Sequence, residues 1–358
     1  GVIEVDLSEI RPMIAMPFHP SCAYTIEDVN KNLMDILEET EKRAKVSFGD
    51  KVNFTLKNKV IDGKLYCDQG IIAGCAGGGY ENICAAADIL KNANTGNDKF
   101  TLSVYPASTP IYLELMKNGA AVELMKAGAV VKTAFCGPCF GAGDTPANGA
   151  FSIRHSTRNF PNREGSKIQS GQLSSVALMD ARSIAATAAN KGFLTPAKEY
   201  AEDYSKKPYF FDKSIYESRV YDSKGIAHPE VEIQFGPNIK DWPSMSELKD
   251  DLLLKVVSEI HDPVTTTDEL IPSGETSSYR SNPLGLAEFT LSRKDPAYVG
   301  RAKAVRDNTD EIKAEVKAVA NTIETKYDVF KGRVTNAELG STIYAVKPGD
   351  GSDREQAA

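Results

Sequence analysis

Two cysteines in a glycine- and proline-containing turn, Cys136-Gly137-Pro138-Cys139, have the spacing that most clearly indicates chemistry in this sequence. Half of a zinc site would need a second CxxC or a histidine pair, and the sequence spaces neither for it. A redox dithiol usually opens a helix, whereas this pair precedes a long glycine loop. A structural pair of buried thiols remains open, and so does an iron–sulfur cluster with Cys75 as its third thiolate. Three thiolates would leave one iron without a protein ligand, which is the open position that a Lewis-acid catalyst needs.

A polar loop after the CxxC turn contains three arginines, Arg154, Arg158 and Arg163. Such a loop is either a solvated basic segment or a clamp whose guanidinium groups bind carboxylates or phosphates in pairs of hydrogen bonds. His155 lies between two of these arginines, and a single histidine in a polar loop is more often a structural hydrogen-bonding group. The loop is therefore a candidate anion-binding element.

The composition indicates a soluble globular protein of about two domains. Of 358 residues, 41% are hydrophobic and 25% are charged, and no apolar run is long enough to span a membrane. The 42 basic and 49 acidic residues give a net charge of -7, which argues against a nucleic-acid partner. A small anionic substrate stays compatible with this charge, because a few arginines dominate the field inside a cleft. With six cysteines and no secretory signal in view, we expect reduced thiols and a cytoplasmic location.

Hydrophobic patterning predicts an α/β fold in which strands and helices alternate. The expected strands cover residues 2–7, 52–56, 59–66, 70–74, 100–105, 129–135, 252–257 and 342–346. The expected helices cover residues 26–37 after Thr25 as N-cap, a segment ending at 93, and residues 109–125, 173–190 and 296–325. This alternation indicates a mostly parallel sheet, whose ligands gather at the carboxyl ends of the strands. Cys75 and Cys136 each follow an expected strand.

Composition divides the chain into three parts. Residues 1–197 form the predicted α/β domain, and residues 198–250, rich in Lys, Asp, Ser, Pro and Tyr, form a predicted linker or loop-rich lead-in. Residues 251–358 form a second domain that ends just after a strand and a glycine turn. Because a helix is expected to follow that turn, we expect this domain to be truncated at its C-terminus.

Five motifs, in order along the chain, resemble those of the aconitase and isopropylmalate dehydratase superfamily. They are Gly74-Cys75 with Tyr80-Glu81-Asn82, Cys136-Gly137-Pro138-Cys139, Arg158-Asn159-Phe160-Pro161-Asn162-Arg163, Thr266-Thr267-Asp268 and Gly349-Asp350-Gly351-Ser352-Asp353-Arg354-Glu355. The resemblance implies a three-layer α/β/α domain with a mostly parallel sheet, followed by a partial swivelling β/α domain. It covers only the later half of the family, so we expect a fragment of a larger hydratase whose N-terminal domains would be its partners.

The resemblance also implies a reaction and the residues that carry it. Cys75, Cys136 and Cys139 would hold a [4Fe–4S] cluster, and Ser352 would be the general base that removes a proton next to a carboxylate. Substrate carboxylates would be bound by Arg158, Arg163, Arg280 and Arg354. The implied enzyme is a hydro-lyase that dehydrates and rehydrates a hydroxy di- or tricarboxylic acid. We expect the isolated fragment to be inactive, because the missing domains supply the catalytic acid.

Departures from the family motifs bear on the substrate. Residues 76–79 replace polar residues after the first cysteine, Thr157 replaces an asparagine, Glu269 a histidine and Asp353 a serine. The carboxylate of Asp353 beside the expected base disfavours a tricarboxylate bound in the family's usual way, so citrate is not predicted. The alternative to an enzyme is a divergent, non-catalytic binding or regulatory module.

Overall fold

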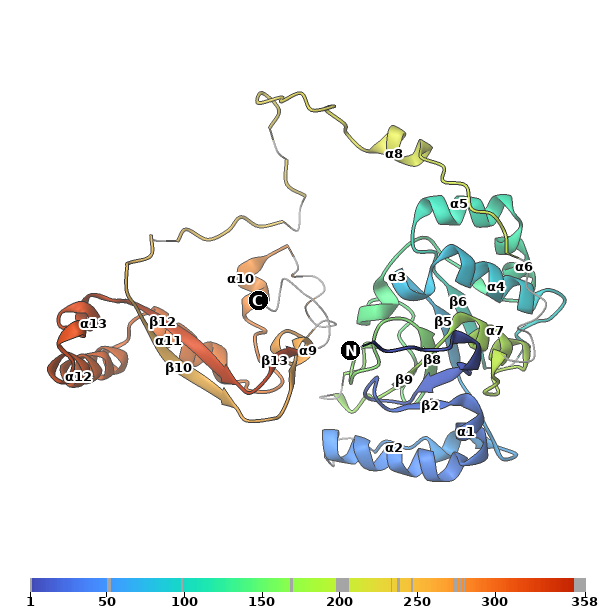
Figure 1. The fold of residues 1–358 in the computed structure, drawn as a ribbon, viewed down its shortest axis with the longest axis horizontal. Coiled ribbons are helices and arrows are strands. Elements are labelled where there is room, and N and C mark those ends of the chain that lie inside the picture. Colours follow the sequence, from blue (N-terminus) through green and yellow to red (C-terminus); the bar gives the residue numbers. More distant parts are fainter. Residues whose placement is uncertain are drawn as a thin grey trace. The chain divides into compact units, whose positions relative to one another are not determined.

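A computed structural model divides the chain into two compact units, with the division between His228 and Pro229 (Figure 1). The described residues are 2–49, 53–97, 99–167, 170–197, 206–232, 234–236, 239–245, 247–272, 276, 279 and 281–350. The division falls inside the segment 198–250 that the sequence predicts to be a linker. Among these residues, no helix combines the length and the apolar character that a membrane span needs.

A sheet of seven strands, in the order β2-β1-β9-β8-β5-β6-β7, forms the centre of the first unit (Figure 1). Its strands are β1 (Met13–Ala15), β2 (Ala23–Thr25), β5 (Gln69–Ile72), β6 (Thr101–Val104), β7 (Val130–Val131), β8 (Phe151–His155) and β9 (Ser175–Met179). The five strands from β9 to β7 run parallel, and β1 is antiparallel to both β9 and β2. The predicted α/β class with a mostly parallel sheet is therefore confirmed. A short hairpin, β3 (Val60–Ile61) and β4 (Lys64–Leu65), precedes β5.

Side-chain caps mark the start of three helices of this unit. The described helices of the unit are η1 (Leu7–Glu9), α1 (Ile26–Lys31), α2 (Leu33–Phe48), η2 (Lys57–Lys59), α3 (Gly74–Gly77), α4 (Tyr80–Leu90), α5 (Thr109–Lys117), α6 (Ala120–Lys126), η3 (Gly137–Phe140), α7 (Ala181–Ala189) and α8 (Ser214–Arg219). The side chains of Thr25, Ser108 and Asp180 each accept a hydrogen bond from a backbone N–H in the first turn of the helix that follows. These caps satisfy donors that have no partner within the helix.

The two faces of strand β8 are covered differently. Phe151 and Ile153 point into the main hydrophobic core, where the alanine-rich helices α4 and α7 pack together. Because side chains alternate along a strand, Ser152 and Arg154 point to the opposite face. The segment that carries η3 lies on that face, since Arg154 Nη1 donates to the carbonyl of Pro138 at 2.6 Å. The CxxC turn is thus attached to the sheet itself.

The chain reverses its direction across the sheet at β5. It passes from β5 to β6 and β7 on one side, and then returns to place β8 and β9 on the other side. The carboxyl ends of β5 and β8 therefore lie beside each other at a topological switch point, where open α/β sheets bind their ligands. Cys75 follows β5, and the arginine loop follows β8.

The second unit contains two short parallel ladders. Its elements are β10 (Leu252–Ile260), β11 (Thr265–Thr266), α9 (Thr267–Leu270), α10 (Pro283–Ala287), α11 (Tyr298–Arg306), α12 (Asp310–Lys326), η7 (Asp328–Phe330), α13 (Arg333–Asn336), β12 (Glu338–Ala345) and β13 (Pro348–Asp350). Strand β10 pairs with β12, and a small core around Val257, Val305 and Ile312 joins this ladder to α11 and α12. Strand β11 pairs with β13.

Several predicted elements are wrong at the N-terminus and around β9. The strand expected over residues 2–7 does not form among the described residues, because Val2 and Ile3 are about nine-tenths exposed and bury no apolar face. The helix expected over 173–190 is a strand in its first part: Ser175–Met179 forms β9, buried between β8 and β1, and helix α7 begins only after Asp180. Strand β8 was not predicted. Pairing within the sheet outweighs helix propensity here.

Several of the predicted helices are interrupted. The helix expected over 26–37 is divided at Asn32, and the one over 109–125 is divided at Gly119, whose φ is 82°. The helix expected over 296–325 consists of α11 and α12. The segment at Thr265 that the sequence treats as a loop forms β11 and α9. Glycine at Gly119 permits the left-handed conformation that ends α5 before α6 begins.

Substituting Asp180→Ala tests the cap of α7. The carboxylate accepts hydrogen bonds from the Ser183 N–H at 3.0 Å and from the Ser183 hydroxyl at 2.6 Å. Its loss should cost about 1 kcal/mol and lower the melting temperature by roughly 2–4 °C, measured by circular dichroism. The control Asp35→Ala removes an exposed carboxylate from the first turn of α2 and should cost only a few tenths of a kcal/mol. Equal effects in the two variants would contradict the role of this cap.

Candidate functional site

The CxxC turn and the segment after β5 approach each other at Gly74. Gly74 has a φ of 71°, and a Cβ at this position would lie 2.7 Å from Cys139 Sγ and 3.9 Å from Cys136 Sγ. Helix α3, which begins at Gly74 and includes Cys75, packs against η3, which includes Cys139. The three predicted cysteine ligands therefore lie on two adjoining turns. Cys75 and Cys136 are exposed, whereas Cys139 is buried.

The sulfur of Cys139 has three polar neighbours. Its hydrogen bond with Cys136 raises the pKa of the Cys139 thiol, and burial raises this pKa further. The backbone N–H of Thr157 and the positive charge of Arg163 act in the opposite direction. A bound cation would favour the thiolate in the same way that these two groups do.

Two further glycines bring α3 against the ends of the strands. A Cβ on Gly77 would lie 2.2 Å from the carbonyl oxygen of His155, and a Cβ on Gly78 would lie 2.4 Å from the carbonyl oxygen of Tyr105. Neither contact could be relieved by a side-chain movement alone, because both neighbours are backbone atoms. The glycines that depart from the family motif therefore have a packing role in this chain.

The loop after β8 is anchored at its asparagine. Asn159 is fully buried, and its Nδ2 donates to the carbonyl oxygens of Met16 at 2.8 Å and Ala15 at 3.1 Å. On either side of this anchor, Arg158 is half-buried and Arg163 is buried near Cys139. The structure therefore brings Arg163 to the cysteine cluster, and it places Arg158 on the same anchored loop.

Arg154, which the sequence places in the same polar loop, lies instead on strand β8; it is only 1% exposed and lies beneath the CxxC turn. Among the described residues, its hydrogen bonds go to neutral groups: the Ser152 hydroxyl, the Gln69 amide oxygen and the carbonyls of Pro138 and Asp144. Burial lowers the pKa of its guanidinium to about 10, so it stays charged at neutral pH. Arg154 is thus part of the protein interior and not of a solvent-facing clamp.

Over the part of the chain that the structure describes, four buried polar atoms of residues 155–162 have no hydrogen-bond partner. They are His155 Nδ1, Ser156 Oγ, Asn159 Oδ1 and Asn162 Oδ1. Burial lowers the pKa of His155, so its imidazole stays neutral at pH values where a solvent-exposed histidine would already gain a proton. Buried polar atoms are normally paired, and a group of unpaired ones in a single loop indicates a place where a ligand, water or further protein surface belongs.

A cluster of charged and polar side chains that was not predicted from the sequence lies at the ends of β6 and β7. Lys132 Nζ lies 2.7 Å from Asp144 Oδ1, and the Tyr105 hydroxyl donates to Asp144 Oδ2 at 2.6 Å. Burial alone would raise the pKa of the Asp144 carboxyl, but these two hydrogen bonds hold it below its usual range. Tyr105 and Lys132 each directly follow a strand, and that position was the signal in the sequence.

Three predicted site residues, Arg280, Ser352 and Arg354, lie outside the described residues. The described parts of their motifs are nevertheless adjacent, because Thr266 of β11 pairs with Asp350 of β13. Glu269, which stands in place of the family's histidine, completes a capping box with Thr266. Over the residues that the structure describes, no three side chains of His, Cys, Asp or Glu are arranged to hold a metal ion.

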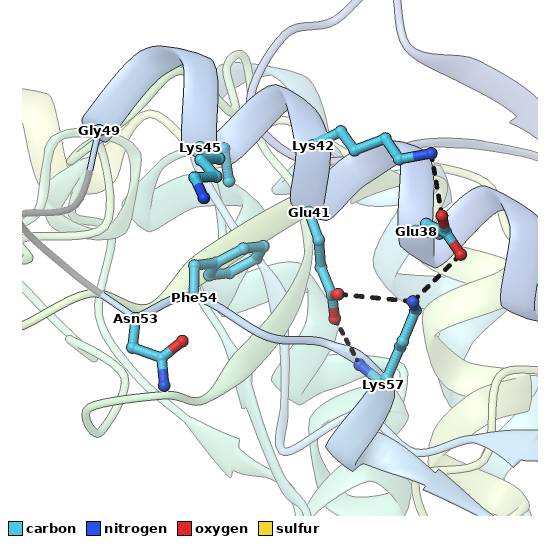
Figure 2. A pocket seen from close by; sticks show the side chains of 9 residues that line it. Glu38, Glu41, Lys42, Lys45, Gly49, Asn53, Phe54 and Lys57 are labelled. Atoms are coloured by element: carbon cyan, nitrogen blue, oxygen red, sulfur yellow. Dashed lines mark hydrogen bonds and ion pairs between the residues drawn. The ribbon is translucent and has the colours of Figure 1, made fainter.

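A separate pocket lies between α2 and the segment around Phe54 (Figure 2). Its lysines face carboxylates: Lys42 lies 2.9 Å from Glu38, and Lys57 lies 3.3 Å from Glu38. Glu41 also accepts a hydrogen bond from the backbone N–H of Lys57 at 3.0 Å. These ion pairs offset part of the positive charge of the three lysines that line the pocket, and none of the predicted site residues lines it.

Substituting Gly74→Ala tests the contact between α3 and the CxxC sulfurs. Backbone strain and the clash with Cys139 Sγ should together cost about 2–5 kcal/mol of unfolding free energy, measured with urea. Alkylation of the buried Cys139 should also become faster. The matched control is Gly119→Ala, because Gly119 also has a positive φ, of 82°, but has open space around it. This control should cost only about 1–2 kcal/mol. The contact would be refuted if both variants lost the same stability and Cys139 kept its reactivity.

Comparisons with known proteins find relatives for the first unit of this chain. The family model described as the aconitase family (aconitate hydratase) matches residues 1–186, which ends within α7. The 3-isopropylmalate dehydratase large subunit of Thermoanaerobacter sp. (strain X514) is 32% identical over 185 residues, which are 51% of this chain and 36% of that protein. The methanogen homoaconitase large subunit of Methanocaldococcus jannaschii is 28% identical over 194 residues, which are 54% of this chain and 37% of that protein.

The aligned region therefore spans little more than a third of the length of these relatives. It contains the central sheet, both cysteine turns and the arginine loop. Because the family model matches more than half of this chain, the chain belongs to the aconitase family.

Proposed function

We propose that this chain is the cluster-binding and substrate-binding part of an iron–sulfur hydro-lyase that acts on a hydroxy di- or tricarboxylic acid. The observation that carries the proposal is the approach of the two cysteine turns at Gly74, beside an arginine loop, at the switch point of the sheet. The named relatives are the large subunits of a 3-isopropylmalate dehydratase and of a homoaconitase, which supports this class of activity. Reduced thiols in a cytoplasmic setting suit such a site.

The residues present fit a cluster better than a single ion. The donors are the three thiols of Cys75, Cys136 and Cys139, which are soft ligands that suit iron–sulfur clusters. A cluster distributes its thiolate ligands over different iron atoms, so its ligands need not converge as closely as those of one ion. Because Gly74 has no side chain, the Cys75 turn can lie close to the sulfurs of the CxxC turn.

Each group of the site would have a distinct task. A bound [4Fe–4S] cluster with three protein ligands would supply a Lewis-acidic iron with an open position. Arg158 and Arg163 would bind substrate carboxylates in bidentate fashion and stabilise the charge that develops when the neighbouring carbon loses its proton. In this proposal Ser352 is the base, and Arg280 and Arg354 bind carboxylates from the second unit. The catalytic acid would come from protein outside this chain.

Anaerobic reconstitution with iron and sulfide tests the cofactor. The wild-type chain should gain visible thiolate-to-iron absorption and about four irons per chain, and Cys136→Ser should lose most of both. Cys22→Ser is the control, because Cys22 is a partly exposed cysteine away from the CxxC turn, and it should load like the wild type. Exposure to air should bleach the absorption, since the cluster would lie close to the surface.

Equal loading of the wild type and Cys136→Ser, or no loading of the wild type, would refute the cluster. In that case the alternative of a non-catalytic binding or regulatory module would be favoured. Zinc in place of iron, found by metal analysis, would also contradict the proposal.

Titration of the reconstituted chain with 3-isopropylmalate, followed by calorimetry, tests the substrate class. Arg158→Gln removes a charge-assisted pair worth about 1.5–3 kcal/mol, so binding should weaken roughly 10- to 100-fold. Arg182→Gln is the control, because Arg182 lies on α7 with its side chain 46% exposed, and it should change binding less than twofold. If the two variants bound equally well, Arg158 would not be a carboxylate ligand.

A further inference from the structure

The guanidinium of Arg154 connects the CxxC turn to the strands beneath it. Arg154 extends from β8 on the face that the turn covers, and it is essentially inaccessible to solvent, at 1% exposure. Its Nη1 donates to the carbonyl of Pro138 at 2.6 Å, and its Nη2 donates to the carbonyl of Asp144 at 3.2 Å. Pro138 lies between the two cysteines, and Asp144 lies in the loop that follows them. One side chain therefore fixes two points of the segment that carries the thiols.

Neighbouring polar groups hold this guanidinium in place. Ser152, two residues earlier on β8, accepts from Arg154 Nε at 3.0 Å. Gln69 of β5 accepts from Arg154 Nη2 at 3.3 Å and from the Ser152 hydroxyl at 2.7 Å. Gln69 Nε2 also donates to the carbonyl of Asp144 at 3.1 Å. Two adjacent strands of the sheet thus clamp the loop through one network.

Filling space alone does not explain an arginine at this position, because its buried charge costs free energy. Burying an ion costs several kcal/mol unless an opposite charge contacts it, and an apolar side chain of similar size would avoid this cost. Within the described residues Arg154 has no ion-pair contact, and its anionic neighbours at longer range are Glu164 and Asp144. The sulfur of Cys139 is also within its electrostatic reach. The guanidinium of arginine is planar and has five N–H donors in fixed directions, so it can donate to two carbonyls at once. A lysine ammonium cannot do this in the same geometry.

We propose that Arg154 is a positioning residue: it fixes the backbone of the turn so that Cys136 and Cys139 present their sulfurs together, and it adds a buried positive charge beside them. The inference deepens the proposed function, because such a turn would be prepared to hold a cluster. The positioning itself does not require iron. It can therefore be measured in the metal-free protein.

The measurement is the equilibrium between the Cys136–Cys139 dithiol and glutathione in the full chain. One glutathione disulfide oxidises the two thiols to a disulfide and leaves as two molecules of glutathione, which take up the two thiol protons. The equilibrium constant reports how well the turn holds the sulfurs together. Mass spectrometry of the peptide that contains both cysteines distinguishes this disulfide from reactions of the other cysteines.

Arg154→Met and Arg154→Lys should each lower this constant at least tenfold, because neither side chain holds both carbonyls. Ser152→Ala removes only one supporting contact, so it should lower the constant less, and it serves as the informative variant where Arg154→Met fails to fold. Arg182→Met, at an exposed position of α7, is the control and should stay within twofold of the wild type. Thermal unfolding of each variant separates loss of stability from loss of positioning.

The proposal is overturned if the folded Arg154 and Ser152 variants keep the wild-type constant, even when their melting temperature falls. A second arm loads the same variants with iron and sulfide, and Arg154→Lys should retain less than half of the wild-type iron. If the wild type itself takes up no iron while the glutathione constant still depends on Arg154, the cluster is refuted and the positioning role stands. The two proposals therefore fail separately.

Discussion

The close approach of backbone at Gly74, Gly77 and Gly78 is the constraint on which the site depends. At each of these positions a Cβ would lie less than 3 Å from a sulfur or a backbone atom of another segment. Without side chains there, α3 lies directly against the CxxC sulfurs and against the ends of β6 and β8. A polar residue at either of the last two positions would push α3 away from the strands. The glycines that replace polar residues of the family motif are therefore required for the packing of α3 against the strands.

Much of the site could be predicted from sequence because its residues lie where the chain leaves a strand. Cys75 follows β5 and Arg158 follows β8, and parallel strands bring such positions to one edge of the sheet. The failure to predict strand β8 also has a physical reason. Strand β8 reads Phe-Ser-Ile-Arg-His, an alternation that is typical of a strand, but its second face is covered by a loop and contains a buried arginine. An arginine in the sequence suggests solvent or substrate, and only the three-dimensional network shows that Arg154 is internal.

The boundaries of β9 and α7 also show where prediction from local sequence fails. Residues of β9 have good helix propensity, yet they pair with β8 on one side and β1 on the other. Part of the stabilisation of β9 comes from its pairing with β1, a strand more than 150 positions earlier in the chain. A local sequence pattern cannot reveal such a long-range pairing. The helix start at Asp180, by contrast, depends on a local cap and was present in the sequence as an acidic residue before an alanine-rich run. Of the caps at Thr25, Ser108 and Asp180, only Thr25 was predicted from the sequence, and the long-range pairings needed the structure.

The unpaired polar atoms of the arginine loop indicate where another surface or a ligand could bind. His155, Ser156, Asn159 and Asn162 each bury a polar atom that has no partner among the described residues, and an unpaired buried polar group costs about 1–3 kcal/mol. Such a cost is tolerable where another surface or a ligand supplies the missing hydrogen bonds. The aligned region covers only 36% of the length of a dehydratase relative, so most of that relative's surface has no counterpart in the matched part of this chain. The unpaired atoms thus lie on the loop that carries Arg158 and Arg163, beside the CxxC turn, and this loop is where additional protein or substrate would gain the most by binding.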